Sequence, residues 1–329
     1  YHVTLYHYLS IRANVDGNSE ERARYVDMAI ESARKHDDQL RLAYLLLTKA
    51  DVTEAEDRTK SMGIMKEAID IFDYLGTKAG FASALEKLGR FEATRGEYNL
   101  AIEHYEEAVS IRESLNIFTG LVSLLLSTFY NVIGEYESGL DWGRMAEEQF
   151  ENRPILKPRA VLHQAWSLIL LSKLTEAQAL LDTIQETVHK SGHETILAWL
   201  HFVTGILERE KGDYRSAASS IEEALKIYYD RGTDEYVVVI FLKHLAEIEM
   251  LSSDISTAVF PSLALLEEKA ENDDLPGIRG QVLLLKAEIA LRKNDDATLR
   301  EIVLELNALS ENPNTRFLSP HYDRLIKRV

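Results

Sequence analysis

The chain has 329 residues, of which 46% are hydrophobic and 28% are charged, a composition that favours a folded protein over a disordered one. Its 54 acidic and 37 basic residues give a formal net charge of −17, which disfavours binding to nucleic acid and to anionic membrane surfaces. It contains no cysteine and no uncharged apolar run long enough to span a bilayer, so disulfides and a membrane anchor within these residues are excluded and we expect a cytoplasmic location.

The hydrophobic pattern is helical from end to end and predicts about eight helical hairpins. Their first helices are expected at residues 2–15, 38–55, 79–95, 118–133, 158–172, 194–211, 235–252 and 276–292. Their second helices are expected at residues 19–35, 60–74, 98–115, 136–151, 175–190, 214–230, 256–271 and 297–310, with a last partial helix from near Ser319. Pro261 falls inside one of these ranges, so that helix should start late or be kinked.

A repeated sequence frame supports this division. The segment GEYNLAIEHYEEAV at 96–109 recurs as GDYRSAASSIEEAL at 212–225, with weaker copies that start at Gly134 and Ser172. In each good copy a glycine permits a tight reversal, an aromatic side chain follows, and small or apolar residues then share one helical face. About seven residues before the turn, Gly89 and Gly205 should mark the place where the two helices of a hairpin cross closely.

The frame resembles the tetratricopeptide repeat, and the resemblance extends over nearly the whole chain. Predicted turns at Gly17, Gly96, Gly134, Ser172, Gly212, Ser253 and Asn294, with an unmarked one near Glu56, are about 38 to 41 residues apart. The usual period of that family is about 34, so we expect helices longer by about one turn per hairpin. Long-period arrays of this kind are similar to sensor regions of maltose-activator-type signalling ATPases, to bacterial peptide-pheromone receptors and to long-repeat scaffold proteins.

The resemblance implies an α-solenoid, a right-handed superhelix whose first helices line a concave groove where partners bind. We expect residues 1–329 to form one such domain, cut from a longer protein because the chain starts at Tyr1 without a signal-like segment. The expected groove residues are Glu86, Arg90, Thr128, Asn131, Arg159, His163, Trp166, Trp199, Phe202, Arg209, Lys243, Glu247 and Glu288. Tryptophan and phenylalanine at helical spacing more often belong to a core than to a ligand site, so a core position stays open as the alternative for the three aromatic residues.

Motifs for catalysis, cofactors and metals are not found. The sequence has no phosphate-binding glycine loop, dinucleotide fingerprint or nucleophile elbow, and His189 and His193 are separated by an expected turn. Acidic pairs such as Glu106 and Glu107 are adjacent in sequence, so they do not face each other on a helix and fit a solvated surface. The lysine and asparagine that tetratricopeptide proteins use to hold a chaperone's C-terminal carboxylate are also missing at the corresponding positions, where Glu86 with Arg90 and Leu124 with Thr128 stand.

The sequence therefore predicts a binding scaffold, without enzymatic activity, cofactor or metal, that receives another protein or a peptide in its groove. The alternative is an effector-sensing segment of a multidomain signalling ATPase or transcription regulator, which would bind a peptide or a small effector. The identity of the partner and the oligomeric state stay open.

Overall fold

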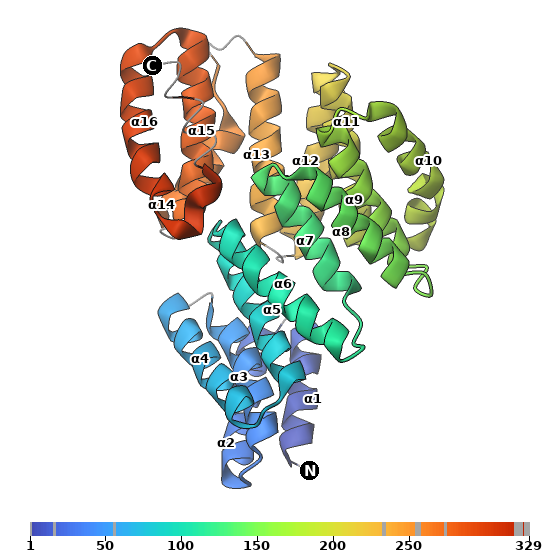
Figure 1. Ribbon diagram of the computed structural model, residues 1–329, viewed down its shortest axis with the longest axis vertical. Helices are drawn as coiled ribbons and strands as arrows, with labels where there is room; N and C mark the ends of the chain where they lie inside the picture. Colours follow the sequence, from blue (N-terminus) through green and yellow to red (C-terminus); the bar gives the residue numbers. More distant parts are fainter. Residues whose placement is uncertain are drawn as a thin grey trace. The chain divides into compact units, whose positions relative to one another are not determined.

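The computed structural model describes residues 2–15, 18–54, 57–231, 235–253, 258–272, 275–318 and 325. These residues form sixteen α-helices and one short 3-10 helix, without a strand (Figure 1). The helices are α1 (His2–Val15), α2 (Ser19–Lys35), α3 (Gln39–Glu54), α4 (Arg58–Tyr74), α5 (Lys78–Thr94), α6 (Tyr98–Ser114), α7 (Gly120–Ile133), α8 (Tyr136–Gln149), α9 (Lys157–Leu170), α10 (Leu174–Ser191), α11 (Glu194–Glu210), α12 (Tyr214–Arg231), α13 (Glu235–Ser252), α14 (Pro261–Asn272), α15 (Pro276–Lys293), α16 (Asp296–Ser310) and η1 (Pro313–Leu318). The all-α prediction is confirmed.

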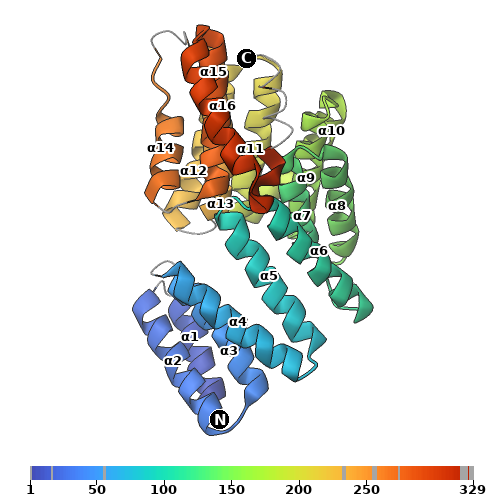
Figure 2. The ribbon, with the colours of Figure 1, turned by 60° about the vertical axis from the view of Figure 1, so that its left-hand side comes forward.

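The helices pair into hairpins as predicted, with each odd-numbered helix first and each even-numbered helix second. Figures 1 and 2 show this antiparallel pairing for α15 and α16. Predicted and observed ends differ by at most two residues, except that α14 begins at Pro261, the late start expected from a residue that cannot donate an intrahelical hydrogen bond. The expected turns at Gly17 and near Glu56 and the partial helix near Ser319 lie outside the described residues.

The turns of the repeat frame have the left-handed backbone that the glycines suggested. Gly96, Gly134 and Gly212 have φ values of 74°, 93° and 83°, a region that a residue without a Cβ adopts at little cost. Ser172 and Asn294 take the same conformation at φ 62° and 53°, so the turn survives where the sequence lacks glycine.

The small residues of the first helices lie directly against the second helices of their hairpins. A Cβ added at Gly205 would lie 2.9 Å from the backbone oxygen of Ala217 and 2.8 Å from the side chain of Ile221. A Cβ at Gly89 would meet the ring of Tyr105 at 2.9 Å. At Gly205 the two helices therefore approach more closely than a side chain would allow, whereas at Gly89 the missing side chain makes room for the Tyr105 ring.

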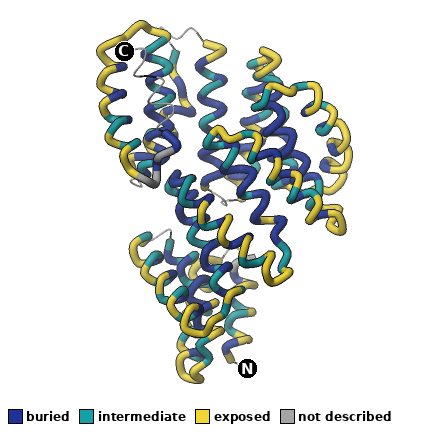
Figure 3. The backbone as a smooth tube through the Cα atoms, viewed as in Figure 1, coloured by how far each residue is buried: buried dark blue, intermediate teal, exposed yellow. Residues whose placement is uncertain are grey.

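The chain divides into two compact units. Unit 1 comprises residues 1–88 and 106–117, and unit 2 comprises residues 89–105 and 118–329. Unit 1 is held by a core that includes Leu45 and Phe72, and unit 2 by a larger core in which α9, α11 and α13 are mostly buried. Figure 3 shows the contrast with α10, whose outer surface is exposed along its length.

Among the described residues, no helix combines the length and the apolar character that crossing a membrane would require.

Candidate functional site

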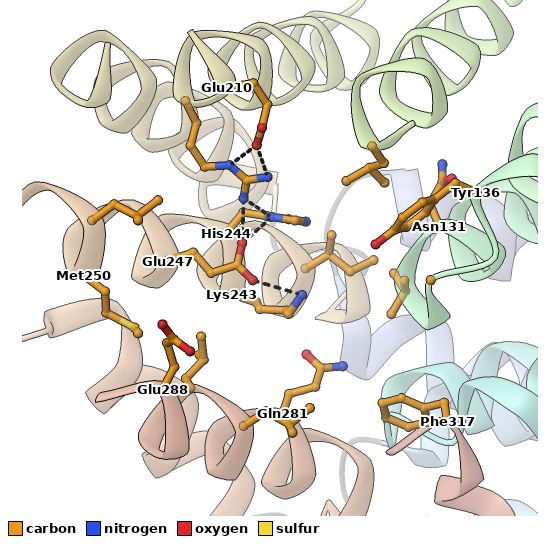
Figure 4. Close-up of a pocket in the computed structure, with 18 of the residues that line it drawn as sticks. Asn131, Tyr136, Glu210, Lys243, His244, Glu247, Met250, Gln281, Glu288 and Phe317 are labelled. Carbon is orange, nitrogen blue, oxygen red and sulfur yellow. Dashed lines mark hydrogen bonds and ion pairs between the residues drawn. The ribbon is translucent and has the colours of Figure 1, made fainter. Parts of the chain in front are cut away.

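A pocket of about 410 Å³ lies in unit 2 and is lined mainly by first helices (Figure 4). We call it the first-helix pocket; its lining residues are Asn131, Val132, Gly134, Tyr136, Leu170, Arg209, Glu210, Ile240, Lys243, His244, Glu247, Met250, Leu251, Gln281, Leu284, Leu285, Glu288, Arg292 and Phe317. They come from α7, α9, α11, α13 and α15, with Gly134 from the turn after α7, Tyr136 from α8 and Phe317 from η1. Consecutive first helices contact one another, so neighbouring helices contribute adjacent parts of the pocket lining.

One wall carries a network of charges between α11 and α13. Arg209 donates from Nη1 to Glu247 Oε2 over 2.6 Å and from Nε to Glu210 Oε1 over 3.0 Å. Lys243 Nζ lies 3.2 Å from the other oxygen of Glu247. Only 12% of the Arg209 side chain and 27% of the Lys243 and Glu247 side chains are exposed, so these ion pairs are screened less by solvent than surface pairs are.

His244 completes this network from its buried side. Its Nδ1 lies 3.0 Å from Glu247 Oε2 and 3.1 Å from Arg209 Nη1. Burial lowers the pKa of His244 to about 4, against the opposing effect of Glu247. Burial also tends to raise the pKa of Glu247, but the charges of Lys243 and Arg209 and the hydrogen bond from His244 hold it well below its usual range. At neutral pH the wall thus holds a neutral imidazole and a carboxylate flanked by two cations.

The three aromatic residues expected in the groove lie behind this wall and not on its surface. Trp166, Trp199 and Phe202 are 0%, 1% and 0% exposed. The Trp166 ring centroid is 5.2 Å from that of Phe202 and 6.1 Å from that of His244, so the cluster backs the charged network directly. The reason for the burial is that neighbouring first helices contact one another, and these rings fill the space between them. The core reading of the three residues is the one the structure supports.

Two further expected residues, Asn131 and His163, belong to a buried polar seam between α7 and α9. His163 Nδ1 lies 3.2 Å from Thr128 Oγ1, and Ser167 donates to Asn131 Oδ1 over 3.0 Å. Burial, together with the charge of Arg159, holds the pKa of His163 well below its usual range. Of this seam only Asn131 reaches the first-helix pocket.

Several buried polar atoms have no hydrogen-bond partner among the described residues. In and near the seam these are Asn131 Nδ2, Arg159 Nε, His163 Nε2 and Trp166 Nε1, and across the pocket on α15 there is Gln281 Oε1. An unsatisfied buried group costs roughly 1–3 kcal/mol, so a bound molecule could gain affinity at those that line the pocket. Asn131 and Gln281 are 4% and 3% exposed, and both line the pocket.

Glu86 and Arg90 do not belong to this pocket. Glu86 lies in the part of α5 assigned to unit 1 and is paired with Arg112 of α6. Arg90 lies in the part of α5 assigned to unit 2, is half-buried and does not line the pocket. Asn131, Arg209, Lys243, Glu247 and Glu288 are therefore the expected residues that the structure brings together.

Some lining residues were not expected from the sequence. On α13, His244 directly follows Lys243; on α15, Gln281 lies one heptad before Glu288 and could have been found from that spacing. Arg292 donates to Glu288 over 2.9 Å and to the Met250 carbonyl over 3.2 Å, which joins α15 to α13. Phe317 lies beyond the repeat frame, so no signal in the sequence placed it here.

The pocket can hold a molecule but shows no arrangement for a metal. In the described part of the chain, no three or more His, Asp or Glu side chains are grouped so that they could bind a metal ion. The lining instead combines apolar side chains such as Leu284 and Met250 with cations, carboxylates and amides (Figure 4). Apolar walls with a small number of polar and charged groups are typical of ligand sites in proteins.

Comparison with known proteins identifies the fold. No protein-family model matches the chain, and no curated protein matches it. Among solved structures, a Rap protein complexed with competence and sporulation factor has a TM-score of 0.65 and 13% identity, with 99% of this chain and 98% of that chain covered. Aspartyl phosphate phosphatase F from Bacillus subtilis has a TM-score of 0.56 and 15% identity, with 95% and 84% covered. The apo form of RapI has a TM-score of 0.50 and 17% identity, with 98% and 96% covered.

At these identities the likeness concerns the fold alone. The chain is an all-α protein built of tetratricopeptide-like helical repeats, as the sequence frame predicted.

Proposed function

We propose that the chain is a binding scaffold that holds a short peptide, free or as a segment of another protein, in the first-helix pocket. The observation that carries the proposal is the lining of this pocket. Apolar side chains of α13 and α15 lie beside Lys243 and Glu288, which are ionisable groups of opposite sign in one enclosure. A peptide presents apolar side chains together with donors, acceptors and both charges, whereas a purely apolar ligand would leave the charges of the pocket desolvated.

The size of the pocket sets the length of the bound segment. A volume of about 410 Å³ is at the lower end of the usual range for ligand sites, which is roughly 300–1,000 Å³. It is sufficient for a few amino-acid residues and not for a folded domain. A similarly folded Rap protein was solved with competence and sporulation factor bound, which supports ligand binding by this fold in general.

An effector-sensing role is the second candidate, and one observation favours it. The pocket joins Asn131 near the start of unit 2 to Gln281 and Phe317 near its end. A ligand that contacts all three would therefore link hairpins that are far apart in the sequence, as a sensor requires. The occupant would then be a regulatory peptide or a small effector, and the scaffold would be part of a larger regulator.

The proposal is tested with a synthetic library of free pentapeptides. The immobilised protein is exposed to the library, retained peptides are sequenced by mass spectrometry, and the tightest one is labelled for fluorescence anisotropy. Replacing Lys243 by alanine should weaken its binding at least tenfold, because a hydrogen bond to a charged group contributes about 1.5–3 kcal/mol. Lys190→Ala is the matched control, since Lys190 lies on α10, is exposed and is absent from the pocket.

Either of two results would contradict the proposed peptide site. If no pentapeptide binds the wild-type protein saturably, or if Lys243→Ala and Lys190→Ala bind the selected peptide equally well, the pocket is not the peptide site.

A further inference from the structure

The turn between α5 and α6 touches the other end of unit 2. A Cβ added at Gly277, on the first turn of α15, would lie only 2.0 Å from the backbone oxygen of Gly96. Tyr98 accepts a hydrogen bond of 3.0 Å at its hydroxyl from Gln281 Nε2. The backbone amide of Phe317 donates to Asn99 Oδ1 over 2.9 Å. We call these residues the latch: Gly96, Tyr98 and Asn99 on one side, and Gly277, Gln281 and Phe317 on the other.

The repeat itself supplies a comparison that isolates the effect of the latch. Tyr98 and Tyr214 occupy the same position in the two best copies of the frame. Tyr98 is fully buried, and burial raises its pKa to about 12 even though its hydroxyl is hydrogen-bonded to Gln281. Tyr214 is only partly buried. The frame alone therefore does not bury this tyrosine. Phe129 of α7 stacks on its ring at a centroid distance of 5.7 Å, and α15 and η1 cover it as well, with the Phe317 ring centroid 5.4 Å away.

The latch and the first-helix pocket share two residues. Gln281 and Phe317 both line the pocket, whereas Tyr98 does not. Gln281 donates from Nε2 to the Tyr98 hydroxyl, and its Oε1 is a buried acceptor without a partner among the described residues. Across the pocket, Asn131 Nδ2 is a buried donor in the same situation. Figure 4 shows Asn131 on α7 and Gln281 on α15, on different sides of the pocket.

We propose that the pocket recognises the main chain of its peptide through a hydrogen bond to Gln281. Tyr98 is the positioning residue that holds the Gln281 side chain in the orientation required for this contact. A peptide N–H donates to Gln281 Oε1 and a peptide carbonyl accepts from Asn131 Nδ2, so the two unsatisfied atoms meet the two halves of an amide backbone. Because the same glutamine binds Tyr98, the ligand stabilises the closed latch, and the closed latch raises the affinity for the ligand by the same factor.

This inference rests on the proposed function, and its test uses the labelled pentapeptide selected there. Tyr98→Phe removes only the hydroxyl, and Tyr214→Phe is the matched control at the equivalent repeat position. We expect Tyr98→Phe to weaken peptide binding about tenfold, within the usual range for coupled sites, and Tyr214→Phe to leave it unchanged. Hydrogen exchange of the Phe317 amide reports the latch directly, and it should slow when the peptide binds the wild type.

Ester analogues of the same peptide test the main-chain contact. Each backbone N–H is replaced in turn by oxygen, and binding is compared between the wild type and Gln281→Met, which keeps the side-chain length without the amide. One ester position should lose about tenfold in affinity for the wild type and little for Gln281→Met, because the missing hydrogen bond is then already absent from the protein.

The outcomes separate the two proposals. If no pentapeptide binds saturably, both are overturned. Suppose instead that the peptide binds and that its binding depends on Lys243. The proposed function then stands, but the latch inference is overturned if Tyr98→Phe binds the peptide like the wild type. It is also overturned if every ester analogue loses as much affinity for Gln281→Met as for the wild type. Should Tyr98→Phe fail to fold, as judged by circular dichroism, the ester series on the wild type and Gln281→Met decides alone.

Discussion

The wall of the first-helix pocket depends on a histidine that carries no charge at neutral pH. His244 faces Lys243 and Glu247 from its own helix, Arg209 from α11, and the rings of Trp166 and Phe202. Because the site already contains two cations and one carboxylate, protonation of the imidazole would add a further positive charge to a desolvated network. The residue works as a neutral spacer whose hydrogen bond keeps Glu247 in place.

Stability should fall as the pH drops from 7 to 5, with His244 as one cause. Its folded pKa of about 4 lies below the usual histidine value of 6.5, so the unfolded chain takes up a proton in this window and the folded chain does not. His244→Gln should reduce the loss by about 2 kcal/mol, as measured by urea denaturation at both pH values. The lowered pKa of Glu247 contributes at lower pH, where that carboxylate protonates. Equal losses for variant and wild type would contradict this account.

At the scale of the helices, hairpins are joined by contacts one repeat apart. Lys87 is paired with Asp51, Thr128 contacts His163, and Arg209 is paired with Glu247, at separations of 36, 35 and 38 residues. These polar contacts connect a helix to its counterpart in the next hairpin. Within a hairpin, small residues such as Gly205 set the distance between the two helices. The stability of such an array is approximately the sum of the stabilities of its hairpins and of the interfaces between neighbouring hairpins. A substitution in one hairpin therefore affects mainly that hairpin and its neighbours.

Two glycine-to-alanine substitutions should have opposite effects. Gly205→Ala places a Cβ 2.9 Å from the Ala217 oxygen and should destabilise the protein by roughly 1–3 kcal/mol. Gly63 lies exposed within α4, with nothing within 4 Å of an added Cβ, so Gly63→Ala should stabilise it by up to about 1 kcal/mol through the higher helix propensity of alanine. Denaturant midpoints of the two variants test the difference. A destabilised Gly63→Ala, or a neutral Gly205→Ala, would contradict the close-crossing model.

At the scale of the whole molecule, the two units can be observed separately. All three tryptophans, Trp142, Trp166 and Trp199, belong to unit 2, whereas circular dichroism detects the helices of both units. Tryptophan fluorescence therefore reports the unfolding of unit 2 alone. Most contacts lie within a unit, and each hairpin depends on its neighbours. We therefore expect the loss of stability caused by a substitution to remain largely within the unit that carries it.

Phe72→Ala tests this expectation. Phe72 is 0% exposed in unit 1, and its ring centroid lies 4.9 Å from that of Tyr44. Its loss should cost about 3–5 kcal/mol and move the circular dichroism midpoint to lower denaturant, while the tryptophan fluorescence midpoint moves much less. Equal shifts of the two midpoints would show that the chain unfolds as one cooperative unit.

The sequence by itself determined the helices, their hairpin pairing and the turns that connect them. These features depend on interactions within about 40 residues: apolar periodicity, a glycine such as Gly96 at φ 74°, and a small residue such as Gly205 at a crossing. It also placed Asn131, Arg209, Lys243 and Glu247 on the inner side of the first helices, and all four line the first-helix pocket; that this surface binds a partner stays a prediction. A repeat frame is sufficient to predict these positions because it defines which residues share each face of a helix.

Only the tertiary structure decided which of those faces are open and which are filled. Trp166 and Trp199 were expected in the groove but are buried, because their rings pack against each other between first helices that are in contact. Tyr98 differs from Tyr214 for a similar reason: a segment almost 200 residues further along the chain covers one of them. Contacts over such separations depend on the summed geometry of several hairpins, which no local pattern of residues encodes.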